Sequence, residues 1–360
     1  MLPPLFALTL AATSATTQAV PRTDTPRAGT FRLTFEPVIT TWEHEFTDST
    51  RQRIAASLPT AVFVRAERRV TSYGVDFGIT NRISVGARFP IVRVSTRESF
   101  PRDSAKVFLD TAGVRRLDSL RRHATFAFDS IRGTPRHQRY YAGDFEVEAK
   151  YRILESHSFA LSSALVVRLP TGHTESPNRL FDLSTGDNQT DIEARVTQEL
   201  TLFNRLWLNG SIRLGRQQPG ERSRRIGPPS TLLIPLAASA TLDWDPGDYA
   251  AIDVAPMYRF TRTFGVGFTA GYYTQGRDRY TFRSMQDSID VATRLGTPIS
   301  ASVLDAGTAV RVTRLGAVVT YAAADMEGSL SIEQTVSGVG GLVPVATVFR
   351  VVMRTSRWPF

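Results

Sequence analysis

Cysteine is absent from the 360-residue chain, and no apolar run long enough for a membrane-spanning helix follows the N-terminus. The first absence excludes disulfides, thiol catalysis and thiolate metal sites. The second argues against a helical membrane protein, because a spanning helix needs about 20 consecutive apolar residues. The mean hydropathy of −0.14 and the hydrophobic content of 42% are not those of a disordered chain either.

Clusters of basic or metal-ligating residues are also missing, although the net charge is +9. The basic residues are almost all arginine and are scattered, whereas a nucleic-acid-binding module gathers them on one face. We therefore expect no nucleic acid partner, and phosphates of lipopolysaccharide or anionic groups in a lumen would fit the positive balance. We expect no cofactor, metal site or catalytic residues, because no metal-ligand spacing joins the histidines, which are His44, His123, His137, His157 and His173.

The N-terminal residues 1–19 are typical of a secretory signal peptide, which leaves residues 20–360 as the exported domain. A short apolar region at residues 5–12 precedes Thr17-Gln18-Ala19, which resembles a small-residue cleavage site. The usual basic residue before the apolar region is missing, and the exact cleavage position stays open. We expect export through this cleaved signal.

Strict alternation of apolar and polar residues marks two linked hairpins, at residues 143–169 and 191–214. Successive side chains of a strand point to opposite faces, so the pattern predicts strands with one apolar and one charged face. A soluble sheet would bury the apolar face, whereas a transmembrane barrel turns it to lipid and keeps a polar lumen.

Long and short connections alternate along the chain, as in bacterial barrels with short periplasmic turns and long extracellular loops. A soluble sandwich does not explain this alternation, and a propeller is disfavoured because no repeat of about 40 to 50 residues occurs. Five short turns and two free ends predict twelve strands in an all-β, antiparallel, up-and-down transmembrane barrel. Fourteen strands would result if the excursion at 217–248 held a spanning hairpin. The short turns lie at residues 80–82, 155–158, 203–205, 261–263 and 324–327.

The longer connections are expected to contain no spanning strands. Residues 42–67 are predicted as a polar connection, and residues 96–140 as a long loop with a short amphipathic helix at 107–120. Residues 274–306 are predicted as a further long loop.

Charged residues on the inward phase of the predicted strands are the candidates for lining a lumen. Two interpretations stay open: the charges set the field and selectivity of a channel, or cross-strand ion pairs fill and rigidify a narrow barrel. The candidates are Arg32, Glu36, Asp76, Arg88, Asp144, Glu146, Glu148, Lys150, Arg152, Arg168, Asp191, Glu193, Arg195, Glu199, Arg213, Asp253, Arg259, Glu333, Arg350 and Arg354.

The leader, the amphipathic strands and the terminal Phe360 resemble Gram-negative outer-membrane proteins. The last strand of those proteins commonly ends in an aromatic residue that the barrel-assembly machinery reads. Four segments resemble, more narrowly, the transporter-like barrels of the meta-pathway phenol-degradation family: residues 73–90 (YGVDFGITNRISVGARFP), 169–172, 185–191 and 258–260. This resemblance implies a twelve-stranded barrel that passes small, often apolar, molecules, but it does not imply phenol as the solute. The connections at 96–140 and 217–248 are longer than in that family.

The sequence therefore predicts a channel or transporter-like barrel in the bacterial outer membrane, for small solutes of apolar or aromatic character. The expected partners are outer-membrane lipid, lipopolysaccharide, the small-molecule solute and, through Phe360, the assembly machinery. We expect no enzymatic activity. The alternatives are a structural or adhesive barrel with a plugged lumen and a barrel-type lipid-modifying hydrolase.

Overall fold

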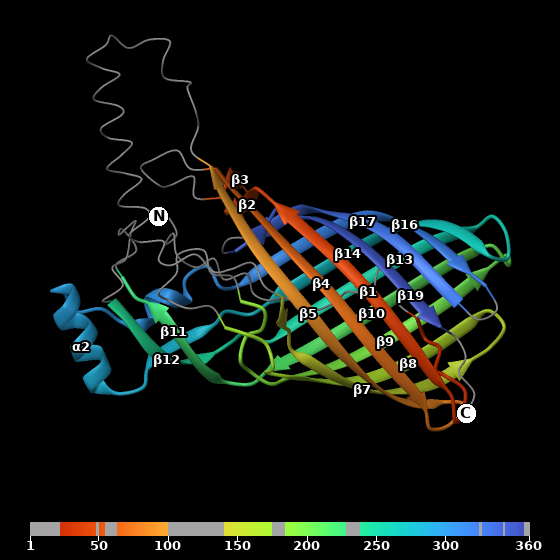
Figure 1. The fold of residues 1–360 in the computed structure, drawn as a ribbon, viewed down its shortest axis with the longest axis horizontal. Coiled ribbons are helices and arrows are strands. Elements are labelled where there is room, and N and C mark those ends of the chain that lie inside the picture. Colours follow the sequence, from red (N-terminus) through yellow and green to blue (C-terminus); the bar gives the residue numbers. More distant parts are fainter. Residues whose placement is uncertain are drawn as a thin grey trace, which may run out of the picture.

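The computed structural model describes residues 22–47, 50–54, 63–99, 140–174, 184–227, 238–323, 326–340 and 343–355. Twelve long antiparallel strands form a closed up-and-down barrel, which confirms the predicted fold class and strand number (Figure 1). The first strand pairs with the last, and this pairing closes the barrel. The twelve strands are β1 (Phe31–Trp42), β4 (Phe63–Gly78), β5 (Ile83–Ser99), β7 (Phe145–Glu155), β8 (Phe159–Leu169), β9 (Asp191–Leu202), β10 (Leu206–Gln217), β13 (Tyr249–Arg259), β14 (Phe264–Gln275), β16 (Val310–Ala322), β17 (Met326–Val339) and β19 (Thr347–Thr355).

One end of the barrel, the short-turn end, carries the short connections, and the opposite end is the long-loop end (Figure 1). The hydroxyl of Thr80 accepts hydrogen bonds from the backbone N–H groups of Arg82 and Ile83, at 3.1 and 2.9 Å. Thr261 makes the same arrangement in the turn between β13 and β14. These side-chain-to-backbone bonds favour a tight turn over a continued strand. The fifth predicted turn lies partly outside the described residues.

The outer face of the barrel is apolar on each of the twelve strands. Phe268 in the middle of β14 is 73% exposed, and Leu165 and Ile212 are each 51% exposed. A soluble monomer rarely exposes a contiguous apolar patch larger than a few hundred Å². A face of this kind around a closed barrel is instead the lipid-facing surface of a transmembrane barrel, which argues against the sandwich alternative.

The long-loop end carries a small cap with its own hydrophobic core, formed by β11 (Gly220–Arg225), β12 (Ser239–Asp245), β15 (Arg279–Phe282), α2 (Met285–Leu295) and η2 (Ala301–Asp305). Because β11 pairs with β12, and β12 with β15, in a sheet separate from the barrel, the excursion at 217–248 adds no spanning hairpin. Ser284 caps the N-terminus of α2, and Gly296 ends the helix with a left-handed φ of +71°. No helix within the described ranges is long and apolar enough to cross a membrane.

Two boundary predictions are wrong. The segment 42–67 is not only a polar connection, since it holds β2 (His44–Thr47), β3 (Thr50–Arg53) and the start of β4, and β2 also pairs with β18 (Val343–Pro344). The loop predicted at 96–140 was given too early a start, because the hairpin of β4 and β5 extends to the pair Phe63 and Ser99. The short β6 (Tyr141–Ala142) also pairs with β5. Charged residues on the outer side of this extension break the alternation of apolar and polar residues that predicts a strand. Its buried Val64 and Ala66 pack near Trp42. The predicted signal peptide, the helix at 107–120 and Phe360 lie outside the described residues.

The lipid-facing assignment predicts a position-dependent cost for a charge on the outer face. We expect Phe268→Arg to lower the free energy of unfolding in bilayers by about 2–4 kcal/mol, since arginine there replaces an apolar contact with lipid. The control is Phe203→Arg in a short turn, where the side chain is 90% exposed and a change of about 0–1 kcal/mol is expected. Equally small effects at both positions would place the outer face in water.

Candidate functional site in the barrel interior

The inner face of the barrel carries the charged residues of the predicted lumen set. Each of the predicted residues is buried or half-buried, because the period-2 alternation turns it away from the apolar outer face. The structure does not bring them into one cluster. One group forms a continuous network from β7 to β13, and the others form smaller sets near β1, β17 and β19.

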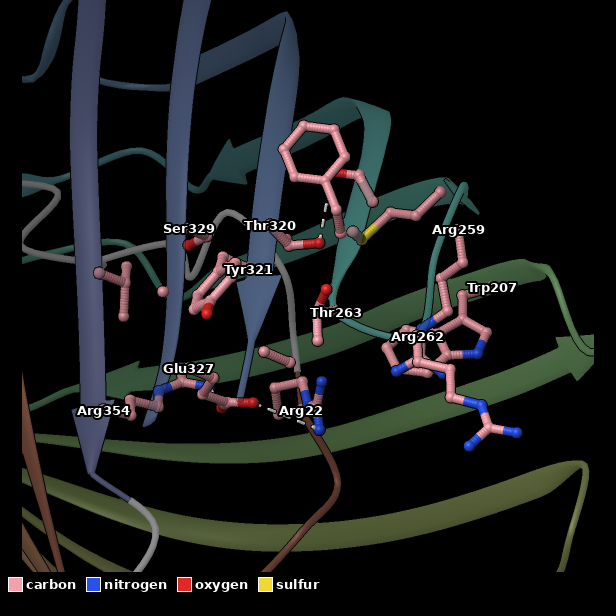
Figure 2. Close-up of a pocket in the computed structure, with 16 residues that line it drawn as sticks. Arg22, Trp207, Arg259, Arg262, Thr263, Thr320, Tyr321, Glu327, Ser329 and Arg354 are labelled. Carbon is pink, nitrogen blue, oxygen red and sulfur yellow. Dashed lines mark hydrogen bonds and ion pairs between the residues drawn. The ribbon is translucent and has the colours of Figure 1, made fainter. Parts of the chain in front are cut away.

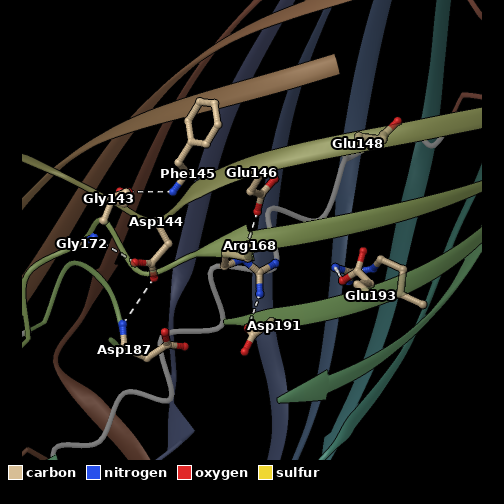
Figure 3. A network of polar contacts seen from close by, with 12 residues as sticks. Gly143, Asp144, Phe145, Glu146, Glu148, Arg168, Gly172, Asp187, Asp191 and Glu193 are labelled. Carbon is tan, nitrogen blue, oxygen red and sulfur yellow. Dashed lines mark hydrogen bonds and ion pairs between the residues drawn. The ribbon is translucent and has the colours of Figure 1, made fainter. Parts of the chain in front are cut away.

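Arg168 on β8 lies between two carboxylates on the neighbouring strands (Figure 3). Its Nε donates to Glu146 Oε1 at 3.2 Å, and a terminal nitrogen donates to Asp191 Oδ2 at 2.6 Å. Glu146 and Asp191 are the direct cross-strand partners of Arg168, so the strand register alone brings the three groups together.

The network continues through Glu193 on β9. Arg195 binds Glu193 at 2.7 Å and reaches Glu148 on β7 at 3.1 Å. Arg213 on β10 lies 3.8 Å from Glu193 and 3.0 Å from Asp253 on β13. Because each of these carboxylates lies beside an arginine, the wall is polar without presenting charge of a single sign.

Tyr249 belongs to this network, although the sequence did not single it out. Its hydroxyl donates to Glu193 Oε2 at 2.7 Å. The ring crosses β10 at Gly215, where a Cβ would collide with ring carbons of Tyr249. Because Gly215 has no side chain, the ring of Tyr249 can cross β10 and reach Glu193, two strands away. The signal in the sequence was a glycine within an otherwise alternating strand, which often marks a close approach of this kind.

A segment at the short-turn end, residues 22–30, enters the barrel before β1, and we call it the N-terminal strap. Arg22 Nε lies 3.3 Å from Glu199 on β9. Another nitrogen of Arg22 lies 3.6 Å from Glu327 on β17 (Figure 2). Between β9 and β17 stand four strands on one side of the barrel and six on the other. One side chain thus connects nearly opposite walls.

Further contacts hold the strap in place, and four of the predicted lumen residues make them, one of which is Arg32, whose guanidinium donates to Asp24 at 2.5 Å. Lys150 Nζ donates to the Arg22 carbonyl at 2.7 Å, and Arg152 donates to Thr25 Oγ1 at 2.8 Å. Glu199 Oε1 accepts the backbone N–H of Thr23 at 2.5 Å. The strap has no alternating pattern, so sequence reasoning did not place it inside the barrel.

Buried acidic groups meet at the long-loop end, where Asp144 directly precedes β7 (Figure 3). Its carboxylate accepts the backbone N–H groups of Gly172 at 2.9 Å and Asp187 at 3.3 Å. Burial, together with the nearby negative charge of Asp187, raises the pKa of Asp144 to about 7. Burial also raises the pKa of Asp187. Among the described residues, no group of three or more His, Asp or Glu side chains is arranged to hold a metal ion.

No protein-family model matches this sequence, and no curated protein matches it. Among solved structures, an outer-membrane channel from Pseudomonas putida F1 is similar at 10% identity, with a TM-score of 0.59 over 92% of this chain and 97% of that one. The CymD monoaromatic hydrocarbon channel is 10% identical, with a TM-score of 0.40 over 100% and 98% of the two chains. The translocator domain of the autotransporter NalP from Neisseria meningitidis is 10% identical, with a TM-score of 0.40 over 96% and 93%. At this identity, the first likeness shows a shared fold.

Removing Arg168 tests the buried network. We expect Arg168→Met to lower the free energy of unfolding in lipid vesicles by about 3–5 kcal/mol, because Glu146 and Asp191 are left buried without the arginine that lies between them. The matched control is Arg283→Met in the cap, whose ion pair with Glu221 is half exposed and contributes about 1 kcal/mol or less. A cost at Arg168 no larger than at Arg283 would contradict the network's structural role.

The acidic groups at the long-loop end predict a pH dependence of stability. The pKa of Asp144 is raised to about 7 in the folded protein and is about 3.9 in an unfolded chain, so the folded state favours the protonated form. Its contribution is complete below about pH 4 and is lost as the pH rises through 7. We expect the free energy of unfolding in detergent to fall over this range, by less in Asp187→Asn than in the wild type. Asp243→Asn in the cap is the control, and identical profiles for all three proteins would contradict the assignment.

Proposed function

We propose that the protein is an outer-membrane channel that passes small solutes. The observation that carries the proposal is the closed barrel with an apolar outer face and a charged inner face. The fold that it shares with the channel from Pseudomonas putida F1 supports this proposal. In this orientation the short-turn end faces the periplasm and the capped long-loop end faces outward, toward lipopolysaccharide.

Small solutes of apolar or aromatic character fit the proposal best. Ion pairs in the network offset one another's fields, so the wall does not select strongly for one sign of charge. The resemblance of residues 73–90 to the meta-pathway phenol-degradation barrels supports the same solute class. The proposal also includes export by a cleaved signal at residues 1–19 and recognition of Phe360 by the assembly machinery. It contains no catalytic step, no cofactor and no nucleic acid partner.

The N-terminal strap bears on the second candidate, a structural barrel with a plugged lumen, because Arg22 connects nearly opposite walls. The strap is held at this point by a few ion pairs and hydrogen bonds, which water can replace when the strap leaves. We infer that the strap limits passage at the periplasmic end and that its release opens the channel.

The test is the conductance of the refolded full chain in a planar bilayer. We expect Arg22→Ala to raise the open fraction about fivefold, since losing contacts worth about 1 kcal/mol shifts a two-state population by that factor. Arg27→Ala is the matched control, because Arg27 is an exposed residue of the same strap.

If the wild type and both variants insert into the bilayer but none of them conducts, the result would favour the plugged structural barrel. A stable fold that needs no detergent would contradict the membrane assignment altogether.

A further inference from the structure

The hairpin of β4 and β5 reaches further toward the long-loop end than its neighbours β1 and β7 (Figure 1). No register shift interrupts its pairing, so its outer face continues from the lipid-facing residues into this extension. Tyr73 pairs with Phe89 on that face, and the two side chains are 50% and 43% exposed. They mark the part of the hairpin that contacts lipid.

Four residues beyond this aromatic pair, the outer face becomes basic. Arg69 pairs directly with Arg93 across the two strands, and Arg65 pairs with Arg97 four residues further on. We call these four arginines the outer arginine patch. Like charges directly opposite each other on neighbouring strands are unfavourable. An anion that bridges each pair would therefore remove this repulsion.

Two carboxylates accompany the outer arginine patch among the described residues of this face. Glu43 lies 3.4 Å from Arg65, and Glu67 lies 2.5 Å from Arg69. Both ion pairs are open to solvent, and exposed ion pairs are weak. The patch therefore keeps an excess of positive charge, and an anion of higher charge can replace its existing partners.

The level of the patch in the membrane follows from its distance to the lipid-facing rings. Four residues span about 13 Å along a strand, and a tilted strand rises by less. Arg69 and Arg93 therefore lie just outside the apolar band, where the polar headgroups of a leaflet begin. The ring centre of Tyr140, a residue that is 56% exposed, lies 5.6 Å from the guanidinium carbon of Arg93. Tyrosine is enriched at this boundary between membrane and water.

We propose that the outer arginine patch binds the phosphate groups of lipopolysaccharide. A planar guanidinium binds phosphate through paired, charge-assisted hydrogen bonds. The lipid part of lipopolysaccharide carries two phosphates above several acyl chains. It can therefore meet both arginine pairs while its chains cover the apolar face beside them, whereas a phospholipid offers a single phosphate. The inference rests on the proposed function only in placing the long-loop end in the outer leaflet.

The test is titration of the full chain in mixed detergent micelles with bisphosphorylated lipid A, with the dissociation constant measured by native mass spectrometry. We expect the double variant Arg69→Gln and Arg93→Gln to bind it about tenfold or more weakly, as the loss of charge-assisted contacts does. Arg216→Gln is the matched control and should bind as the wild type does. Arg216 is an exposed arginine at the long-loop end of β10, and its cross-strand partner on β9 is Ile192. Binding by the double variant that equals the wild type would overturn the proposal.

A ligand series on the wild-type protein needs no variant to fold. Lipid A without its phosphates keeps the acyl chains, and phosphatidylglycerol keeps a single phosphate, so both should bind more weakly than the bisphosphorylated form. Inorganic phosphate should not displace that form. Equally tight binding of the dephosphorylated lipid would overturn the role of the phosphates. Equally tight binding of phosphatidylglycerol, or displacement by inorganic phosphate, would overturn the choice of lipopolysaccharide.

Conductance of the same preparation separates this inference from the channel proposal. A channel that conducts, but whose lipid A binding is unchanged in the double variant, overturns the patch assignment alone. Lipid A binding that depends on Arg69 and Arg93, in a barrel that never conducts, supports the patch and overturns the channel.

Discussion

In a closed antiparallel sheet, each residue that faces lipid forces its neighbours in the chain to face the interior. The interior of this barrel is therefore dense with charge, and a desolvated charge is tolerable only beside a partner. The strand register supplies the partners. Arg168 lies directly between Glu146 and Asp191, and Arg213 lies between Glu193 and Asp253. The strand pairing that builds the sheet from β7 to β13 thus also neutralises much of the inner face there.

The same carboxylates serve the wall and the strap. Glu327 pairs with Arg354 of its own wall and also with Arg22. Glu199 accepts a backbone N–H of the strap and forms an ion pair with Arg22. The strap uses acceptors that the barrel already holds in place, and this couples the position of the strap to the electrostatics of the wall.

The parts of the structure that depend on period-2 alternation could be predicted from the sequence. The twelve strands, their inward charges and the non-spanning excursion at 217–248 could all be predicted, because each follows from which face a residue takes. Contacts that depend on three-dimensional proximity could not. The contact of Tyr249 with Glu193, which crosses Gly215, joins residues of three strands. The strap has no alternating sequence pattern from which its position could be predicted. The start of β4 was missed because charges such as Arg65 and Glu67 interrupt its apolar face.

The position of Arg22 in the chain has a consequence for the order of assembly. Arg22 precedes the first strand, whereas Glu327 lies on β17, next to the final strand β19. The contact between them cannot form until nearly the whole sheet is in place. This contact is therefore a late step of folding, and its presence requires a nearly complete barrel.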